Sequence, residues 1–172
     1  MMYKTILIPL DQSKRAEMIL PQVEELAHIG GAKIVLIHVV EPGIMAYTYY
    51  GGDTEVDLVL MDQLSRTAAI YLESVRARLQ AKGLEASTRV VDGPTVDAIL
   101  RTAAEEHADL IAMASHGRSG LAHVFHGSVT TGVLRHSNIP LLIIRSLETK
   151  PKPDHSTHQP IEKEVAHADR HT

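Results

Sequence analysis

Two patterns of apolar residues alternate along the first 146 residues of the chain. Runs of consecutive aliphatic residues are typical of strands buried on both faces, and they predict strands over residues 4–10, 33–40, 86–91, 109–114 and 139–145. Between these runs, apolar residues recur every three or four positions, which predicts helices over residues 13–28, 58–81, 95–107 and 128–136. Buried strands that alternate with helices predict an α/β fold, a three-layer, doubly wound parallel sheet of five strands.

The first predicted helix contains two residues that bear on where it begins. Ser13 has the side chain of an N-cap, whose oxygen accepts a backbone N–H of the first turn. Pro21 lies inside the helical pattern and predicts either a kink or a helix that begins later than residue 13.

The composition changes after Ser146. Residues 147–172 contain three prolines, four histidines and few aliphatic residues. Such a segment buries too little apolar area to offset the conformational entropy that it would lose on ordering. We therefore predict one folded domain, residues 1–146, followed by a mostly disordered tail, residues 147–172.

Composition and charge exclude several classes of function. The chain has 172 residues, no cysteine and a formal net charge of −4. The absence of cysteine excludes disulfides, cysteine-ligated metals and thiol catalysis, and it is typical of a cytoplasmic protein. A mildly negative charge without a dense basic run disfavours nucleic acid as a partner. No apolar run approaches the ~20 residues of a membrane span, so no membrane association is expected.

Polar and glycine residues gather where the predicted strands end. In doubly wound sheets, ligands bind outside the carboxyl ends of the strands, where the strand order reverses. Asp11 follows the first strand, where its carboxylate would accept hydrogen bonds from ribose hydroxyls. The fourth strand leads into a loop with Gly117, Gly120 and Gly127 and then to a helix that begins at Ser128, an arrangement suited to phosphate. Glycines before a helix also form plain tight turns, so the residues alone leave both interpretations open.

Other candidate chemistry is weaker. Neither G-x-x-x-x-G-K-[ST] nor G-x-G-x-x-G after the first strand is present. His38, inside the second strand, is expected to be a structural histidine with satisfied ring nitrogens. A matching carboxylate at ligand spacing is absent around His116, His123, His126 and His136, and the tail histidines would bind Ni or Zn only weakly and adventitiously, so we predict no metal site. No nucleophile stands in a triad arrangement, so no catalytic residue is assigned.

Four segments, in order along the chain, resemble the universal stress protein family. They read ILIPLDQS from Ile6, IHVVEP from Ile37, DLIAMASHGRSGL from Asp109 and HGSVTTGVLRHSNIPLLIIR from His126. The resemblance covers about residues 2–146 and implies the sheet order 3-2-1-4-5 of the adenine-nucleotide α-hydrolase-like fold. It also implies a homodimer through the fifth strand, from Ile139 to Arg145, whose apolar edge would pair with a second copy.

One branch of this family binds ATP and carries the pattern G-x-x-G-x9-G-[ST]. The second glycine of the pattern is Gly117, the last two positions are Gly127 and Ser128, and Ala114 stands at the first position in place of glycine. Alanine adds a single methyl group in a strand that does not require glycine. We therefore expect the chain to bind ATP or AMP together with Mg²⁺.

The resemblance also implies the residues that bind the ligand. Asp11 would hold the ribose, Val39 would meet adenine through its backbone, and Pro9 and Met113 would line the base site. The phosphates would lie against Gly117, Gly127, Ser128 and Val129, flanked by His116 and Arg118. Leu10 and Ala114, next to these residues in the chain, complete the predicted site.

These observations predict a cytoplasmic protein that binds an adenine nucleotide and acts as a stress-response or signalling switch through its dimer or its partners. A nucleotide-free dimeric scaffold of the same fold is the alternative, and Ala114 keeps it open. An ATP pyrophosphatase of related architecture ranks last, because residues 11–14 read DQSK where such enzymes carry a Ser-Gly-Gly loop. Any catalysis would amount to slow ATP hydrolysis or self-phosphorylation.

Overall fold

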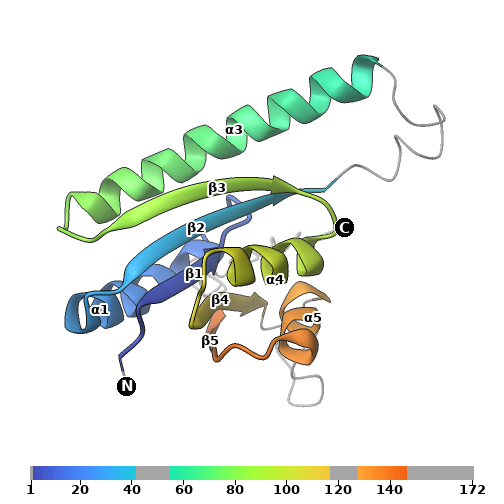
Figure 1. Cartoon of the computed structure of the whole chain (residues 1–172). Coiled ribbons are helices and arrows are strands. Elements are labelled where there is room, and N and C mark those ends of the chain that lie inside the picture. Colours follow the sequence, from blue (N-terminus) through green and yellow to red (C-terminus); the bar gives the residue numbers. More distant parts are fainter. Residues whose placement is uncertain (1, 42–54, 117–127, 147–172) are drawn as a thin grey trace, which may run out of the picture.

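The five predicted strands form one parallel sheet (Figure 1). The computed structural model describes residues 2–41, 55–116 and 128–146. The strands are β1 (Thr5–Pro9), β2 (Lys33–Val40), β3 (Ala86–Asp92), β4 (Leu110–His116) and β5 (Leu141–Ser146). Neighbouring strands are parallel throughout, and their order β3-β2-β1-β4-β5 confirms the order that the resemblance implies.

Helices cover both faces of this sheet. α1 (Leu20–Gly30), α3 (Glu55–Gln80) and the short 3-10 helix η1 (Ala16–Ile19) pack on one face. α4 (Thr95–Glu105) and α5 (Ser128–His136) pack on the other. The three-layer, doubly wound α/β fold is thereby confirmed. Among the helices in the described part of the chain, none is both long and apolar enough to cross a membrane.

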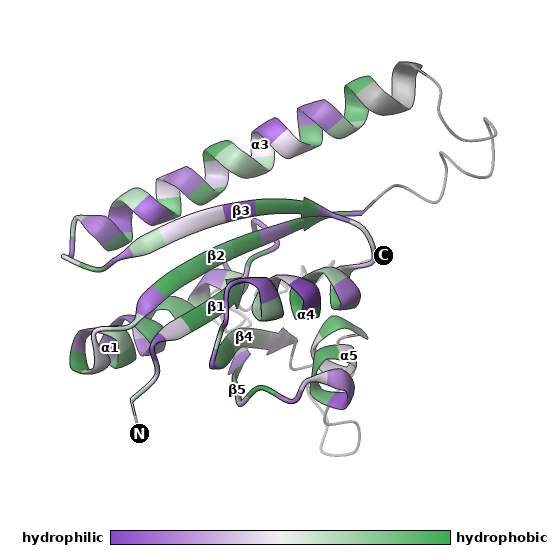
Figure 2. Cartoon of the chain, in the orientation of Figure 1, coloured by the Kyte–Doolittle hydropathy of each residue, from purple (hydrophilic) through white to green (hydrophobic). Residues whose placement is uncertain are grey.

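Each face of the sheet has its own apolar core. Along β1, Ile6 and Ile8 belong to the core under α1 and α3, whereas Leu7 between them belongs to the core under α4 and α5. All three side chains are fully buried. Figure 2 shows β1 and β2 in the colour of hydrophobic residues over most of their length. Burial on both faces explains why these strands read as continuous aliphatic runs instead of alternating ones.

The first predicted helix is divided in two. Instead of one helix over residues 13–28, the chain forms η1 and then α1, which begins at Leu20. Pro21 falls in the first turn of α1, where a missing N–H costs nothing, so the later start that Pro21 predicted is confirmed. The hydroxyl of Ser13 accepts the N–H of Ala16, the first residue of η1, at 3.0 Å, but the N-cap position itself is held by Arg15, whose side chain makes no capping bond.

Several further boundaries differ from the prediction, by three residues or fewer. α3 begins at Glu55 instead of residue 58. β4 continues past Ala114 to His116, because β5 runs alongside it to the same level. β5 begins at Leu141 instead of Ile139, since Pro140 has no N–H to donate to a strand ladder.

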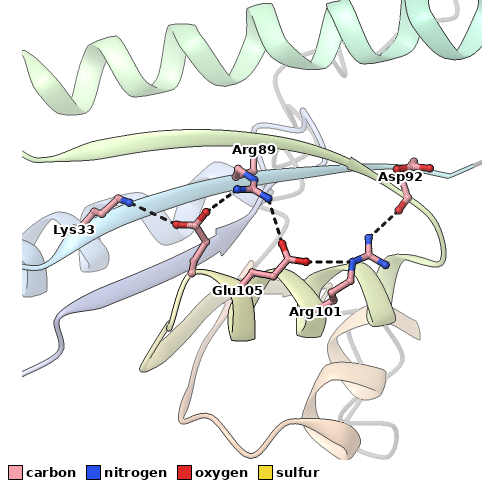
Figure 3. A network of polar contacts seen from close by, with 6 residues as sticks. Lys33, Arg89, Asp92, Arg101 and Glu105 are labelled. Carbon is pink, nitrogen blue, oxygen red and sulfur yellow. Dashed lines mark hydrogen bonds and ion pairs between the residues drawn. The ribbon is translucent and has the colours of Figure 1, made fainter.

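Charged side chains link α4 to the edge strand β3 (Figure 3). Arg89 on β3 pairs with Glu106 at 3.0 Å and with Glu105 at 3.2 Å. Arg101 pairs with Glu105 at 3.8 Å, and Lys33 reaches Glu106 from β2 at 3.5 Å. Because most of these side chains are partly exposed, each pair contributes only about 0 to 1 kcal/mol. Together they cover the side of the β2–β3 edge on which α4 packs.

Candidate functional site

The central strand β1 stops before its two neighbours do. Pro9, the last residue of β1, pairs with Ile37, while β2 continues to Val40. On the other side, β1 is paired with β4 only as far as Leu7, whereas β4 continues to His116. β2 and β4 therefore extend past the end of β1 at the carboxyl edge of the sheet. This is the point of strand-order reversal, where doubly wound folds bind ligands.

The part of β2 that extends past the end of β1 directs backbone N–H and C=O groups, called here its peptide edge, toward the space beyond β1. In a parallel strand, successive residues direct their N–H and C=O to opposite neighbouring strands. The C=O of Ile37 faces β1, since it accepts the N–H of Leu10 at 2.9 Å, and the C=O of Val40 faces β3, since it accepts the N–H of Gly93 at 3.3 Å. Val39 has the same orientation as Ile37, so its N–H and C=O face the side of β2 on which β1 lies, at a level that β1 does not reach.

A cavity of about 260 Å³ occupies this space. Its volume is close to the lower end of the range for small-molecule sites, about 300 to 1,000 Å³. Several residues of the predicted site line it together, and they come from β1, β2, β4, α5 and the turn after β1: Pro9, Leu10, Asp11, Val39, Met113, Ala114 and Val129.

The rest of the cavity wall comes from residues that the sequence does not single out for binding. These are Ala16, Ile37, His38, Thr95, Ile99 and Thr130. Ile37 could have been found from strand alternation, because it shares the face of β2 that carries Val39. Thr95 could have been found from its place in the first turn of the helix that follows β3.

Other predicted residues border the described region. His116 is the last residue of β4, and Ser128 is the first residue of α5. Gly117, Arg118 and Gly127 lie outside the described residues, as does the tail predicted for residues 147–172. The part of these residues in phosphate binding stays a prediction.

Asp11 stands in the turn after β1 with one carboxylate oxygen already engaged. Its Oδ1 accepts the backbone N–H of Ser13 at 3.0 Å and the hydroxyl of Ser13 at 2.5 Å. Both bonds go to the same oxygen, so Oδ2 takes part in neither. Asp11 is exposed and lines the cavity, so hydroxyl groups of a ligand would meet a carboxylate whose orientation is fixed beforehand.

Two helices begin beside the cavity, and their N-termini differ in charge. Thr95 at the start of α4 lines the cavity, but its N–H and its hydroxyl donate to the carboxylate of Glu41. Val129 and Thr130 in the first turn of α5 also line the cavity, and that turn contains no acidic residue. Because a helix N-terminus carries partial positive charge, the α5 end of the cavity favours an anion, whereas the α4 end is already neutralised.

Comparison with known proteins identifies the family to which the chain is similar. A model of the universal stress protein family matches residues 2–145 of the chain. Universal stress protein MJ0577 from Methanocaldococcus jannaschii is 28% identical over 157 residues, which cover 84% of this chain and 96% of that protein. A solved structure of MJ0577 matches with a TM-score of 0.73 at 29% identity, covering 87% of this chain and 100% of its own.

Two further solved structures with the same fold contain a nucleotide. A universal stress protein in complex with cAMP matches with a TM-score of 0.59 at 24% identity, covering 84% of this chain and 98% of its own. The universal stress protein from Archaeoglobus fulgidus in complex with dAMP matches with a TM-score of 0.56 at 22% identity, covering 83% and 98%. At these identities the likeness shows the shared fold.

Proposed function

The chain belongs to the universal stress protein family, and on that premise we propose that the cavity between β2 and β4 binds an adenine nucleotide, with ATP as the ligand. The observation that carries the proposal is the peptide edge of Val39, which faces this cavity beside the carboxylate of Asp11. The N–H and C=O of one residue complement the ring-nitrogen acceptor and the amino donor of adenine. Two proteins of this fold have been solved with ligands of the same class, cAMP and dAMP.

In this arrangement the base lies against the apolar wall that includes Met113 and Pro9, and the ribose hydroxyls donate to Asp11. The phosphates then run toward the N-terminus of α5, whose first turn contains no acidic residue. The part of the site that holds the phosphates would be completed by His116, Gly117, Arg118, Gly127 and Ser128. Mg²⁺ would arrive with the phosphates, since no group of His, Asp or Glu among the described residues could hold a metal ion.

Ala114 separates this proposal from its alternative, a nucleotide-free scaffold of the same fold. Ala114 lines the cavity from within β4, where an extended backbone needs no glycine. Its methyl group therefore takes up room in the cavity without straining the strand. The variant Ala114→Gly removes that methyl group and measures its effect on the ligand directly.

The test is calorimetric titration of nucleotide-stripped protein with ATP and Mg²⁺. We expect saturable binding, and we expect Asp11→Ala to raise Kd at least about tenfold. Asp62→Ala is the matched control, because it removes an equally charged, exposed carboxylate on α3 that does not line the cavity. Folded wild-type protein that gives no heat up to millimolar ATP would contradict the proposal. If Ala114→Gly then bound ATP while wild type did not, this result would support the nucleotide-free scaffold.

The proposal includes a homodimer that forms through β5. β5 is the last strand of the sheet, so one of its edges pairs with β4, and among the described strands none pairs with the other edge, where a second copy would add. Its residues from Leu141 to Ile144 are apolar and only half-buried. Light scattering should give twice the monomer mass for wild type and the monomer mass for Ile143→Glu. Ile70→Glu, on the exposed face of α3, should stay dimeric. A monomeric wild type would contradict this part.

The biological role that follows is a switch in a stress response or a signalling pathway. Occupancy of the cavity by ATP would alter the dimer or a surface that partners recognise. That role also places the protein in the cytoplasm, where ATP is abundant. Differential binding of a protein partner to the ATP-loaded and ATP-free forms would support it, and identical binding to both forms would count against it.

A further inference from the structure

A histidine of β2 holds the turn that carries Asp11. The side chain of His38 lies on the same face of β2 as Leu36, where the chain passes from β1 to η1. Its Nδ1 lies 2.7 Å from the C=O of Leu10, and its Nε2 lies 3.3 Å from the side-chain nitrogen of Gln12. The ring therefore contacts the residue before Asp11 and the residue after it, and it also lines the cavity.

The partners of the ring determine its tautomer. A carbonyl oxygen only accepts hydrogen bonds, so Nδ1 of His38 carries the proton that it donates to Leu10. In the neutral ring, Nε2 then has a lone pair and accepts an N–H of the Gln12 amide. Both nitrogens are thus used for one purpose, which is to hold the turn against β2.

The turn needs such support because its backbone is strained. Gln12 has φ of 66°, in the left-handed region that residues with a Cβ rarely adopt. That conformation brings the N–H and hydroxyl of Ser13 to Oδ1 of Asp11. Without its bonds to His38, the turn would exchange with conformations that are more favourable for Gln12, and the Asp11 carboxylate would leave its place.

We propose that His38 is a positioning residue for the nucleotide site. His38 and Val39 are neighbours on one strand, so a single rigid element presents a peptide edge to the base and fixes the carboxylate for the ribose. The proposal rests on the proposed function, because it assigns Asp11 to the ligand. It assigns His38, which is also part of the cavity wall, control of where Asp11 stands.

Two substitutions separate this role from simple packing. His38→Leu removes both bonds and should raise Kd for ATP about tenfold at a temperature where the variant is folded. His38→Asn keeps an amide N–H close to the position of Nδ1, so it should still donate to Leu10 and stay within about threefold of wild type. Unchanged affinity in His38→Leu, or an equal loss in both variants, would overturn the proposal.

A readout without nucleotide keeps the proposal separate from the proposed function. Hydrogen exchange at the amide of Ser13 reports whether Asp11 Oδ1 stays in place. Protection there should fall at least about tenfold in His38→Leu and much less in His38→Asn, which loses only the bond to Gln12. If wild type bound no ATP, the proposed function would fail while this measurement still decided the role of His38. Equal protection in all three proteins would overturn that role.

A third variant covers the case in which His38→Leu does not fold. Gln12 is exposed, so Gln12→Ala should leave the fold intact while removing the bond to Nε2. We expect faster exchange at the Ser13 amide and a Kd for ATP raised about threefold. Wild-type exchange and wild-type affinity in this variant would overturn the proposal.

Discussion

The carboxylate of Glu41, the residue after β2, accepts hydrogen bonds from both the backbone N–H and the hydroxyl of Thr95, the first residue of α4. The N–H bond is 3.1 Å long. Pro94 stands before Thr95 and has no side chain that could cap the helix, so the cap comes from a residue that follows a strand distant in the sequence. Because Thr95 lines the cavity, this pair joins one wall of the candidate site to β2.

Removal of this cap should destabilise the protein without unfolding it. We expect Glu41→Ala to lower the free energy of unfolding by about 1 to 2 kcal/mol, since the first turn of α4 loses its acceptor. Glu41→Gln keeps an acceptor oxygen but loses the charge that interacts with the helix dipole, so its cost should be smaller. Urea denaturation measures both. Glu25→Ala, at an exposed position of α1, controls for the loss of a negative charge. The prediction would be contradicted if Glu41→Ala and Glu25→Ala had the same urea denaturation midpoint.

Gly132 allows α5 to approach α4 closely. A Cβ at Gly132 would lie 2.6 Å from Cγ2 and 3.2 Å from Cγ1 of Val96, so no rotation of the valine would relieve both contacts. Alanine normally stabilises a helix by about 1 kcal/mol relative to glycine. Here we expect Gly132→Ala to destabilise by about 1 to 3 kcal/mol, because the overlap outweighs that gain.

A double-mutant cycle tests the cause of that destabilisation. In a Val96→Ala background the overlap disappears, so adding Gly132→Ala should stabilise the protein instead. Thermal unfolding of the four proteins gives the coupling between the two positions. A Gly132→Ala effect of the same sign in both backgrounds would show that Val96 is not the obstacle.

The hydroxyl of Tyr71 on α3 donates to Glu17 of η1 at 3.1 Å. Burial, and after it the negative charge of Glu17, raises the pKa of Tyr71 above its ordinary value near 10. In the unfolded chain the phenol ionises at its ordinary pKa, so its contribution to stability is present below about pH 10 and is lost as pH rises further.

We therefore expect the free energy of unfolding to fall more steeply above about pH 10 in wild type than in Tyr71→Phe. Urea denaturation at about pH 9 and about pH 10.5 measures the difference. Tyr3→Phe is the matched control, and it should keep the wild-type dependence. Parallel curves for wild type and Tyr71→Phe would mean that Tyr71 carries no raised pKa.

The layers of the fold could be predicted because burial on both faces of a strand leaves a local pattern. β2 has the predicted bounds, Lys33–Val40, since its aliphatic run is broken only by His38 and a charged residue follows it. The order of the strands has no such local pattern. It depends on pairings such as Ile6 with Leu110, far apart in the chain, and only the resemblance to a family supplied it.

The candidate site could be predicted where its residues follow strand ends, as Asp11 and Val39 do. His38 was predicted as a satisfied structural histidine, and both of its ring nitrogens have partners. Its place in the cavity wall and its hold on the Asp11 turn could not be predicted, because they depend on the register between β1 and β2. The same holds for Glu41 and Thr95, which are 54 positions apart.

Asp11 gives a prediction that identifies which part of the nucleotide it binds. If its Oδ2 accepts hydrogen bonds from the ribose, then deleting the carboxylate and deleting the ribose hydroxyls remove the same interaction. Wild type should therefore prefer ATP over 2′,3′-dideoxy-ATP by about tenfold or more, and Asp11→Ala should bind the two nucleotides about equally. Calorimetric titration of both proteins with both nucleotides measures this coupling.

The turn formed with Ser13 supplies the control for this experiment. Ser13→Ala removes the hydroxyl that donates to Oδ1 of Asp11 but leaves the backbone N–H bond and the carboxylate in place. It should weaken ATP and the dideoxy nucleotide less than Asp11→Ala weakens ATP, and it should keep the preference for ATP. If Asp11→Ala retained the full preference instead, another group would hold the ribose, and Asp11 would act on the site only through the turn that it forms.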